Sequence, residues 1–157
     1  DAESAVQQRI PLPPGSTETH PFIHYDWMPT LLNLTGISHP TPQLLDGEDL
    51  LLSLLDDNPL TERTPRFMWH EPNFWMHSGP ESSIRDDRWK LIYFYVDRHW
   101  ELYDLDQDIG ERTNLIDEHP EIATPLAAGL ISWLDTHGAH YPVDLVSGEE
   151  TPPTAPQ

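Results

Sequence analysis

The chain has 157 residues, 37% of them hydrophobic, and its 27 acidic and 8 basic residues give a formal charge of −19 at neutral pH. This length is enough for one domain with a modest core. The acidic charge excludes nucleic acid as a partner, because phosphate binding needs clustered Lys and Arg. The sequence has no Cys, which excludes disulfides, thiol catalysis and Cys-based zinc sites. No apolar run reaches the roughly 18–20 residues of a membrane span.

The first 22 residues are polar and Pro-rich and predict an extended entry segment. A helix is predicted over residues 26–35, with the Asp26 side chain accepting backbone N–H groups of its first turn. Gly36 is placed to end this helix in a left-handed conformation. After a turn at Asp46-Gly47, the spacing of leucines predicts a second short helix near 49–55.

The middle of the chain predicts a small sheet, because residues 66–105 are rich in aromatic and β-branched side chains. Four short antiparallel strands are expected, near 66–70, 82–86, 89–96 and 100–104. Asp86-Asp87 marks a tight turn between the second and third strands. Isolated hairpins are marginal in water, so a helix must cover one face of the sheet.

An amphipathic helix near the C-terminus supplies that cover, with apolar residues at three- and four-residue spacings between Ile122 and Leu134. Pro125 leaves two alternatives. Either the helix begins at Pro120 and kinks at Pro125, or Thr124 caps a helix that begins at Pro125. Gly138 ends the helix in both cases. The expected fold class is α+β, a four-stranded antiparallel sheet packed by a C-terminal helix.

The acidic run from Asp104 to Glu111 suggests calcium at first sight. An EF-hand loop needs Gly at its sixth position and Glu at its twelfth. Counted from Asp104, these positions hold Ile109 and Leu115, so the run is interpreted as a solvated turn. His137 and His140 have no obvious carboxylate partner and do not predict a metal site.

The best candidate for ligand binding is the segment from His70 to His77, which combines a strand end, aromatic residues and a Gly-bounded loop. Imidazole can donate to a sulfate or sugar oxygen, and Trp or Phe rings stack on sugars. His70 is the leading candidate, followed by Asn73 and His77. The alternative is that the aromatic residues are satellite core and the histidines are incidental. Arg85 and Lys90 flank the Asp86-Asp87 turn and are expected to form salt bridges within an acidic domain.

Short blocks in a fixed order carry more information than any single site. They are Asp26-Trp-Met-Pro-Thr-Leu-Leu-Asn-Leu-Thr-Gly36, Leu45-Asp-Gly47, Arg66-Phe-Met-Trp-His70, Ser83-Ile-Arg-Asp-Asp-Arg-Trp-Lys-Leu-Ile92, Glu101-Leu-Tyr-Asp-Leu105 and Asp108-Ile-Gly-Glu111 followed by Asn114-Leu115. Together they resemble the C-terminal part of polysaccharide-type, formylglycine-dependent sulfatases. Family members often carry Gly where this chain has Asp87, and some carry a His where it has Asn73.

The resemblance implies a division of the chain. Residues 1–65 would be the end of a larger alkaline-phosphatase-like α/β domain and a connection. Residues 66–140 would form the C-terminal α+β subdomain, and residues 141–157 a Pro-rich flexible tail. The compartment is not defined by the sequence, although a periplasmic or secreted location is compatible with the full-length parent.

The resemblance also implies hydrolysis of a sulfate ester, on a sulfated carbohydrate, by a formylglycine hydrate beside a calcium ion. Both groups are expected outside this chain, in the N-terminal domain that would be its partner. No catalytic and no metal-ligating residue is therefore assigned here. The chain is expected to support the fold, to form one wall of the substrate pocket and to be inactive alone. The alternatives are a non-catalytic remnant or an acidic interaction module.

Overall fold

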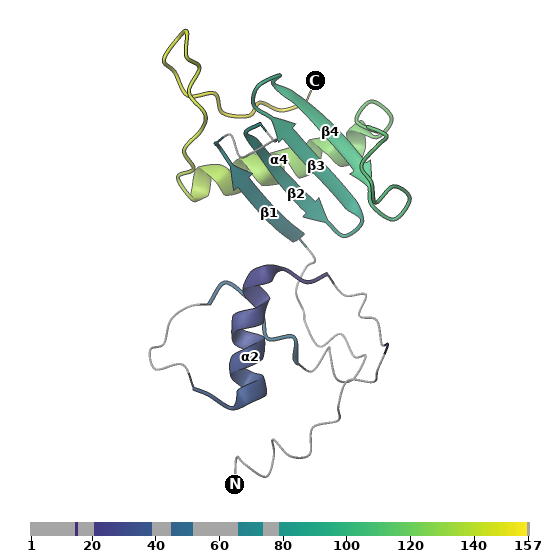
Figure 1. Ribbon diagram of the computed structural model, residues 1–157. Helices are drawn as coiled ribbons and strands as arrows, with labels where there is room; N and C mark the ends of the chain where they lie inside the picture. The colour runs from purple at the N-terminus through teal and green to yellow at the C-terminus, as the bar shows by residue number, and fades with distance from the viewer. Residues whose placement is uncertain (1–14, 16–20, 39–44, 52–65, 74–78, 157) are drawn as a thin grey trace. The chain divides into compact units, whose positions relative to one another are not determined.

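The computed structural model describes residues 15, 21–38, 45–51, 66–73 and 79–156. The chain divides into two compact units, residues 1–63 and 64–157. The first contains the short 3-10 helix η1 (His24–Asp26) and helix α2 (Trp27–Thr35). The second contains a four-stranded sheet and helix α4 (Pro120–Thr136) (Figure 1). The helix predicted near 49–55 lies mostly outside the described residues.

Helix α2 confirms the helix predicted at 26–35. Gly36 ends it in the left-handed conformation, at φ 69°, which glycine adopts without steric cost. The predicted role of Asp26 as the cap of this helix is wrong, because its side chain makes no hydrogen bond to the first turn of α2. Its fully buried carboxylate instead accepts the amides of Ile23 and Glu48, each at 3.0 Å.

Asp26 and Thr30 thus attach the segment 45–51 to helix α2. The Thr30 hydroxyl donates to the Asp26 carbonyl at 2.7 Å and accepts the Leu50 amide at 3.1 Å. Gly47 lies so close to η1 that a Cβ there would be 2.2 Å from the Tyr25 carbonyl oxygen. Only glycine fits at that position, which explains the Leu45-Asp-Gly47 block physically.

The sheet of the second unit is an antiparallel meander in the order β1-β2-β3-β4. Its strands are β1 (Arg66–Glu71), β2 (Glu81–Asp86), β3 (Trp89–Phe94) and β4 (His99–Asp104). This confirms the four predicted strands, except that β3 ends at Phe94 rather than at 96. The predicted turn between β2 and β3 contains Asp87 at φ 55°, a left-handed conformation that favours glycine.

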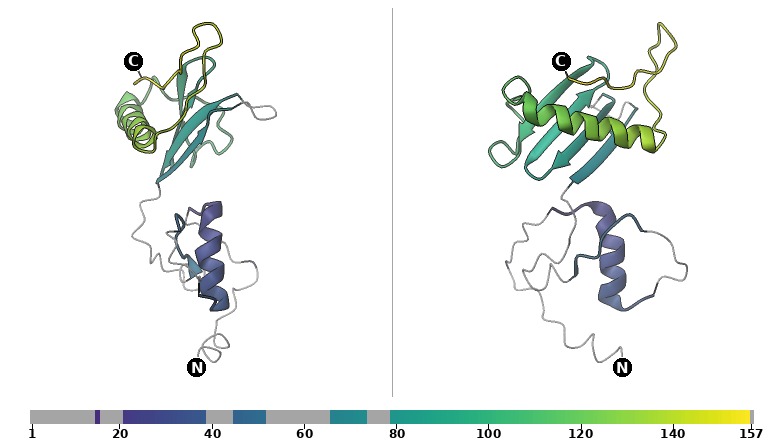
Figure 2. Two further views of the ribbon diagram at one scale, coloured as in Figure 1. Left: turned by 90° about the vertical axis from the view of Figure 1, so that its left-hand side faces the viewer. Right: turned by 180° about the vertical axis from the view of Figure 1, so that it is seen from behind.

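Helix α4 covers one face of the sheet (Figure 2). Its buried residues Ala123, Leu126, Ala127, Leu130 and Leu134 recur at helical spacing. They pack against the buried sheet residues Ile84, Leu91, Tyr93, Tyr95, Trp100 and Leu102. The helix begins at Pro120 and contains Pro125. The alternative in which Thr124 caps a helix that begins at Pro125 is therefore wrong. Gly138 follows the end of α4 at φ 61°, as predicted.

The C-terminal segment 139–156, expected to belong largely to a flexible tail, is bonded to the second unit at several points. Val143 and Glu150 form an isolated antiparallel bridge. The Trp100 indole donates to the Thr154 carbonyl at 2.7 Å, and Arg98 forms an ion pair with Asp144 at 2.9 Å. The bonds of Trp100 and Arg98 attach this segment to the start of β4 and to the turn before it.

Candidate functional site

His70, the leading site residue from the sequence, lies near the end of β1 and is half-buried. Its Nδ1 atom is 2.7 Å from the Ser82 hydroxyl on β2, and its Nε2 atom is 2.8 Å from the His140 carbonyl oxygen. Ser82 is also 2.7 Å from the phenol oxygen of Tyr95, just after β3. A chain of three side chains therefore joins three consecutive strands to the segment after α4.

The direction of these hydrogen bonds follows from the donors and acceptors available. A carbonyl oxygen only accepts, so Nε2 of His70 carries the hydrogen and donates to His140. In the neutral ring, Nδ1 must then accept from the Ser82 hydroxyl. The Ser82 oxygen is left to accept from Tyr95, which gives a single direction from Tyr95 through Ser82 to His70.

Aromatic rings enclose this chain of bonds. The His70 ring meets the rings of Tyr95 and Tyr141 edge-on, with centroids 6.2 and 5.9 Å apart. Burial raises the pKa of Tyr95 to about 12, against an opposing effect of the Ser82 hydrogen bond. The phenol is therefore a stable hydrogen-bond donor at neutral pH. His70 is held in one orientation.

The structure describes only one of the other two predicted contact residues, Asn73 and His77. Asn73 is described and exposed, two residues beyond the end of β1. His77 lies outside the described residues, as do Phe74 and Trp75. Among the residues of the second unit that are described, Ser82, Tyr95 and Tyr141 complete the surroundings of His70. Sequence reasoning missed all three, because no local pattern connects residues 70, 82, 95 and 141.

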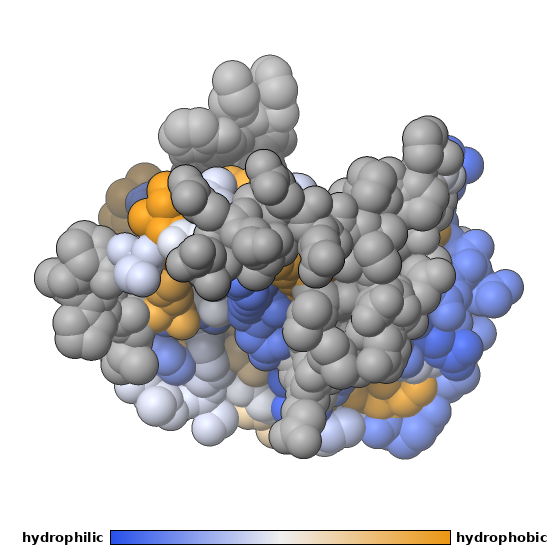
Figure 3. All heavy atoms as spheres, turned by 90° about the horizontal axis from the view of Figure 1, so that it is seen from below, coloured by the Kyte–Doolittle hydropathy of each residue, from blue (hydrophilic) through white to orange (hydrophobic). Residues whose placement is uncertain are grey.

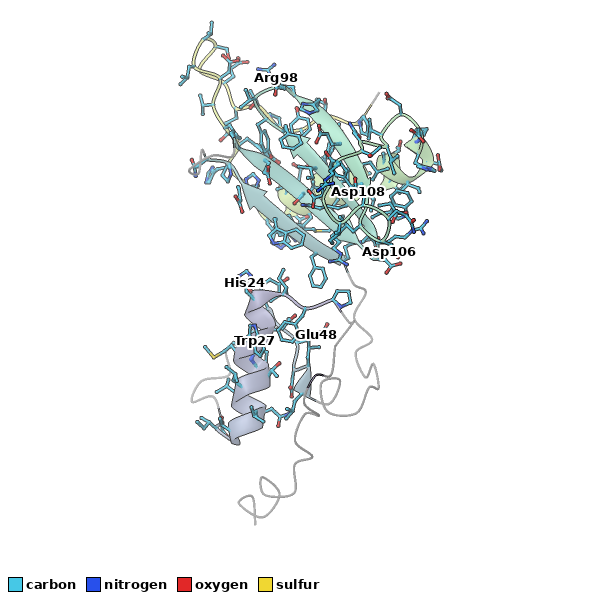
Figure 4. All side chains as sticks on the ribbon, turned by 45° about the vertical axis from the view of Figure 1, so that its right-hand side comes forward. His24, Trp27, Glu48, Arg98, Asp106 and Asp108 are labelled. Carbon is cyan, nitrogen blue, oxygen red and sulfur yellow. The ribbon has the colours of Figure 1, made fainter. Side chains whose placement is uncertain are left out.

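The acidic run that follows β4, where Figure 4 labels Asp106 and Asp108, forms hydrogen bonds within the protein. Asp104 accepts the Asp106 amide at 3.1 Å, and Asp108 accepts the amides of Arg112 and Thr113 at 2.6 and 2.9 Å. The amides of Arg112 and Thr113 lower the pKa of Asp108. These bonds shape a turn, the role interpreted from the sequence.

Arg85 and Lys90, on β2 and β3, form bonds within the second unit. Lys90 forms the predicted ion pair, with its ammonium 2.7 Å from a carboxylate oxygen of Glu111. Arg85 donates through Nε to the Asp87 carbonyl at 2.9 Å, a bond to the backbone of the turn. In the described part of the chain, no helix is long and apolar enough to cross a membrane.

Comparison with known proteins decides the family. The model for the C-terminal part of N-sulphoglucosamine sulphohydrolase matches residues 7–135, most of this chain. The chain belongs to the sulfatase family. A sulfatase from Formosa agariphila is 29% identical over 153 residues, which cover 88% of this chain and 28% of that protein. This sulfatase segment therefore spans less than a third of its relative and corresponds to a C-terminal part.

Solved sulfatases share the fold of this segment. A 2-O GAG sulfatase is 24% identical with a TM-score of 0.57, and the match covers 82% of this chain and 29% of that one. A protein solved in complex with its substrate D-glucosamine-2-N,6-O-disulfate is 24% identical with a TM-score of 0.54, and the match covers 72% of this chain and 24% of that one. The sheet packed by a C-terminal helix is thus the fold of a sulfatase C-terminal part.

Proposed function

We propose that this chain is the C-terminal part of an enzyme that hydrolyses sulfate esters on a sulfated carbohydrate. The observation that carries the proposal is the family match over residues 7–135. The matching family is described by a sulfated amino sugar, and a solved neighbour binds one. In this proposal the segment supports the fold and forms one wall of the substrate pocket.

The resemblance attributes the bond-breaking chemistry to formylglycine and calcium, and residues of this chain do not fit either group. The sequence has no Cys from which formylglycine could be made. Among the described residues, no three His, Asp or Glu side chains come together to hold a metal ion. We therefore assign no step of hydrolysis to this chain and expect it to be inactive alone.

His70, Asn73 and His77 are the proposed substrate contacts. Both ring nitrogens of His70 already have partners, so a direct bond to substrate requires Nε2 to leave the exposed bond to the His140 carbonyl. Asn73 is exposed, and its amide can both donate to and accept from a sugar hydroxyl. His70 then has a second role, which is to fix the end of β1 from which Asn73 extends.

Exposed apolar residues support the proposal that the first unit packs against a larger α/β domain. Trp27, Met28 and Leu31 follow one another along one side of α2 and are 50%, 56% and 46% exposed. Figure 4 labels Trp27 on this helix. Figure 3 views the molecule from below and shows hydrophobic residues (orange) at the surface among hydrophilic ones (blue). Clustered exposed apolar side chains are typical of an interface, so the separate chain should self-associate.

The test compares two proteins on an aryl sulfate substrate. The first is this chain alone, and the second is the longer product encoded together with the upstream DNA. We expect turnover only from the longer product, which should contain a Cys-x-Pro-x-Arg motif and an early Asp pair. Metal-dependent turnover by this chain alone would contradict the proposal that the catalytic residues lie outside it. An in-frame stop codon upstream would favour a non-catalytic remnant.

A further inference from the structure

The sheet has a second face, opposite to the one that α4 covers (Figure 2). Because side chains alternate along a strand, residues next to the core positions of β1, β2 and β3 point to this face. Five of them line a cavity of about 210 Å³ that opens to solvent. They are Trp69, Glu71, Glu81, Ser83 and Lys90. The cavity has room for one ring-sized ligand.

The charges in this cavity are unbalanced. Glu71 and Glu81 are direct cross-strand partners, and like charges directly opposite each other destabilise a sheet. Lys90 supplies one ammonium, which lies 2.7 Å from a carboxylate oxygen of Glu111. With Glu111 included, three carboxylates face one ammonium, a formal excess of two negative charges. A cation entering the cavity would relieve this repulsion.

The side chain of Ser83 is buried, and its hydroxyl has no hydrogen-bond partner among the residues that the structure describes. Its side chain is on the cavity lining, and the residue is only 5% exposed. Across the described residues, no hydrogen bond is formed by its Oγ atom, and no buried side-chain oxygen is sealed from solvent without a partner. The Oγ atom must therefore reach the cavity, where a ligand can bond to it.

Trp69 completes the set. It is the direct cross-strand partner of Ser83 and is half-buried, so its indole forms an apolar wall beside the carboxylates. An aromatic face attracts an ammonium group and also packs against carbon-bound hydrogens. Carboxylates and a serine hydroxyl accept hydrogen bonds from an ammonium or from sugar hydroxyls. A sulfate group, in contrast, would meet two excess negative charges.

We propose that this cavity is a binding subsite for an unsulfated amino sugar whose amine carries a positive charge. Glu71 and Glu81 bind the ammonium group, Ser83 bonds to a ring hydroxyl, and Trp69 packs against the ring. The choice of a sugar among ammonium compounds rests on the proposed function. The choice of a positive, unsulfated ligand rests on the charges of the cavity alone.

The test measures binding of D-glucosamine to the full chain at neutral pH by saturation-transfer difference NMR, which tolerates self-association of the protein. We expect saturable binding of D-glucosamine. N-acetylglucosamine has no ammonium group, and glucosamine 6-sulfate carries a negatively charged sulfate besides its ammonium group. Both compounds should therefore bind at least about tenfold more weakly than D-glucosamine. Equal or tighter binding of either compound would overturn the proposal.

Variants separate the subsite from general sugar binding. Glu71→Gln changes an exposed residue and should weaken D-glucosamine binding about tenfold, whereas Glu118→Gln, at an exposed glutamate outside the cavity, should not. Ser83→Ala should weaken binding without lowering the melting temperature, because its hydroxyl has no bond to lose. Undiminished binding in both Glu71→Gln and Ser83→Ala would refute the subsite.

The subsite and the proposed function can be refuted independently of each other. If D-glucosamine binds as expected while the longer protein has no sulfatase activity, the subsite stands and the proposed function falls. If the longer protein is an active sulfatase and D-glucosamine does not bind this chain, the function stands and the subsite falls. Tighter binding of a simple alkylammonium ion than of D-glucosamine would refute the assignment to a sugar.

Discussion

Ser82 and Ser83 are neighbours on β2, yet their hydroxyls serve opposite faces of the sheet. Ser82 lies on the face toward α4, where it joins His70 and Tyr95 by two bonds of 2.7 Å. Ser83 lies on the other face and lines a cavity without a hydrogen-bond partner among the described residues. Both are nearly fully buried, with exposures of 1% and 5%. Burial alone therefore does not distinguish their roles.

The first prediction compares alanine at these two positions. Ser82→Ala should lower the free energy of unfolding by about 1–3 kcal/mol, because it leaves the Tyr95 hydroxyl and Nδ1 of His70 without their partner. Ser83→Ala removes a hydroxyl that has no hydrogen bond to the described residues, so it should leave the free energy of unfolding unchanged or slightly raised. Urea unfolding followed by tryptophan fluorescence measures both. Equal losses in the two variants would contradict the bonding pattern.

The second prediction concerns alkaline pH. Burial raises the pKa of Tyr95 to about 12, whereas an exposed tyrosine has a pKa of about 10. Between these values the unfolded phenol loses its proton before the folded one, so the unfolded state binds fewer protons and stability falls as pH rises. Below pH ~10 the contribution is fully present.

Tyr95→Phe tests this dependence, because it removes the titrating hydroxyl and keeps the bond between Ser82 and His70. The loss of stability between pH ~9.5 and pH ~11.5 should be smaller in the variant than in the unmodified chain. Urea unfolding at both pH values measures the difference. The same slope in both proteins would show that other groups, such as Tyr93 and Tyr103, whose pKa values burial also raises, account for the fall.

Two glycines of the C-terminal helix region should respond to alanine with opposite signs. At Gly129, within α4, a Cβ would be 3.7 Å from the Ile84 Cδ1 atom, an ordinary contact. Gly129→Ala should therefore raise the free energy of unfolding by about 0.5–1 kcal/mol. Gly138→Ala should lower it by about 1–2 kcal/mol, because φ there is 61°. Thermal unfolding compares the variants, and a gain in both would refute the helix end at Gly138.

Gly47 tests the attachment of residues 45–51 to helix α2. A Cβ there would be 2.2 Å from the Tyr25 carbonyl oxygen and 2.9 Å from the Asp26 Cα, so Gly47→Ala must move the backbone. The bond from the Glu48 amide to Asp26 should break, and that amide should lose protection from hydrogen exchange. Amides of β2 and β3, in the other unit, should keep theirs.

Gly110→Ala is the matched control for Gly47→Ala. A Cβ at Gly110 would be 3.1 Å from the Nε atom of Arg112, the far end of a flexible side chain that can move away. This variant should leave exchange at Glu48 unchanged. Retained protection of Glu48 in Gly47→Ala would show that the turn tolerates a side chain, contrary to the close approach in the structure.

The sequence predicted the elements well where a local cause sets them. Gly36 and Gly138 end helices because each adopts a positive φ, and glycine is the residue that does so at no steric cost. The strands followed from runs of aromatic and β-branched residues. Asp26 shows the limit of local reasoning. A carboxylate before a helix predicts a cap, but a segment 22 residues away offered the Glu48 amide instead.

Of the residues that meet around His70, the sequence predicted only His70 itself. His70 stood out because it ends a strand beside a glycine-bounded loop. Its partners come from β2, from the end of β3 and from the segment after α4, and no sequence spacing connects them. The cavity on the other face was equally hidden. Glu71 and Glu81 become neighbours only through the register of β1 against β2.

The sequence by itself determined the family and the order of helices and strands, because short blocks and hydrophobic periodicity are local properties of the chain. The tertiary structure decided what the individual polar groups do. Among the described residues, it gave the Ser82 hydroxyl two partners and the Ser83 hydroxyl none, and it used the oxygens of Asp104 and Asp108 in a turn. The physical reason is that a polar side chain takes its role from the donors, acceptors and charges that folding brings within hydrogen-bond distance.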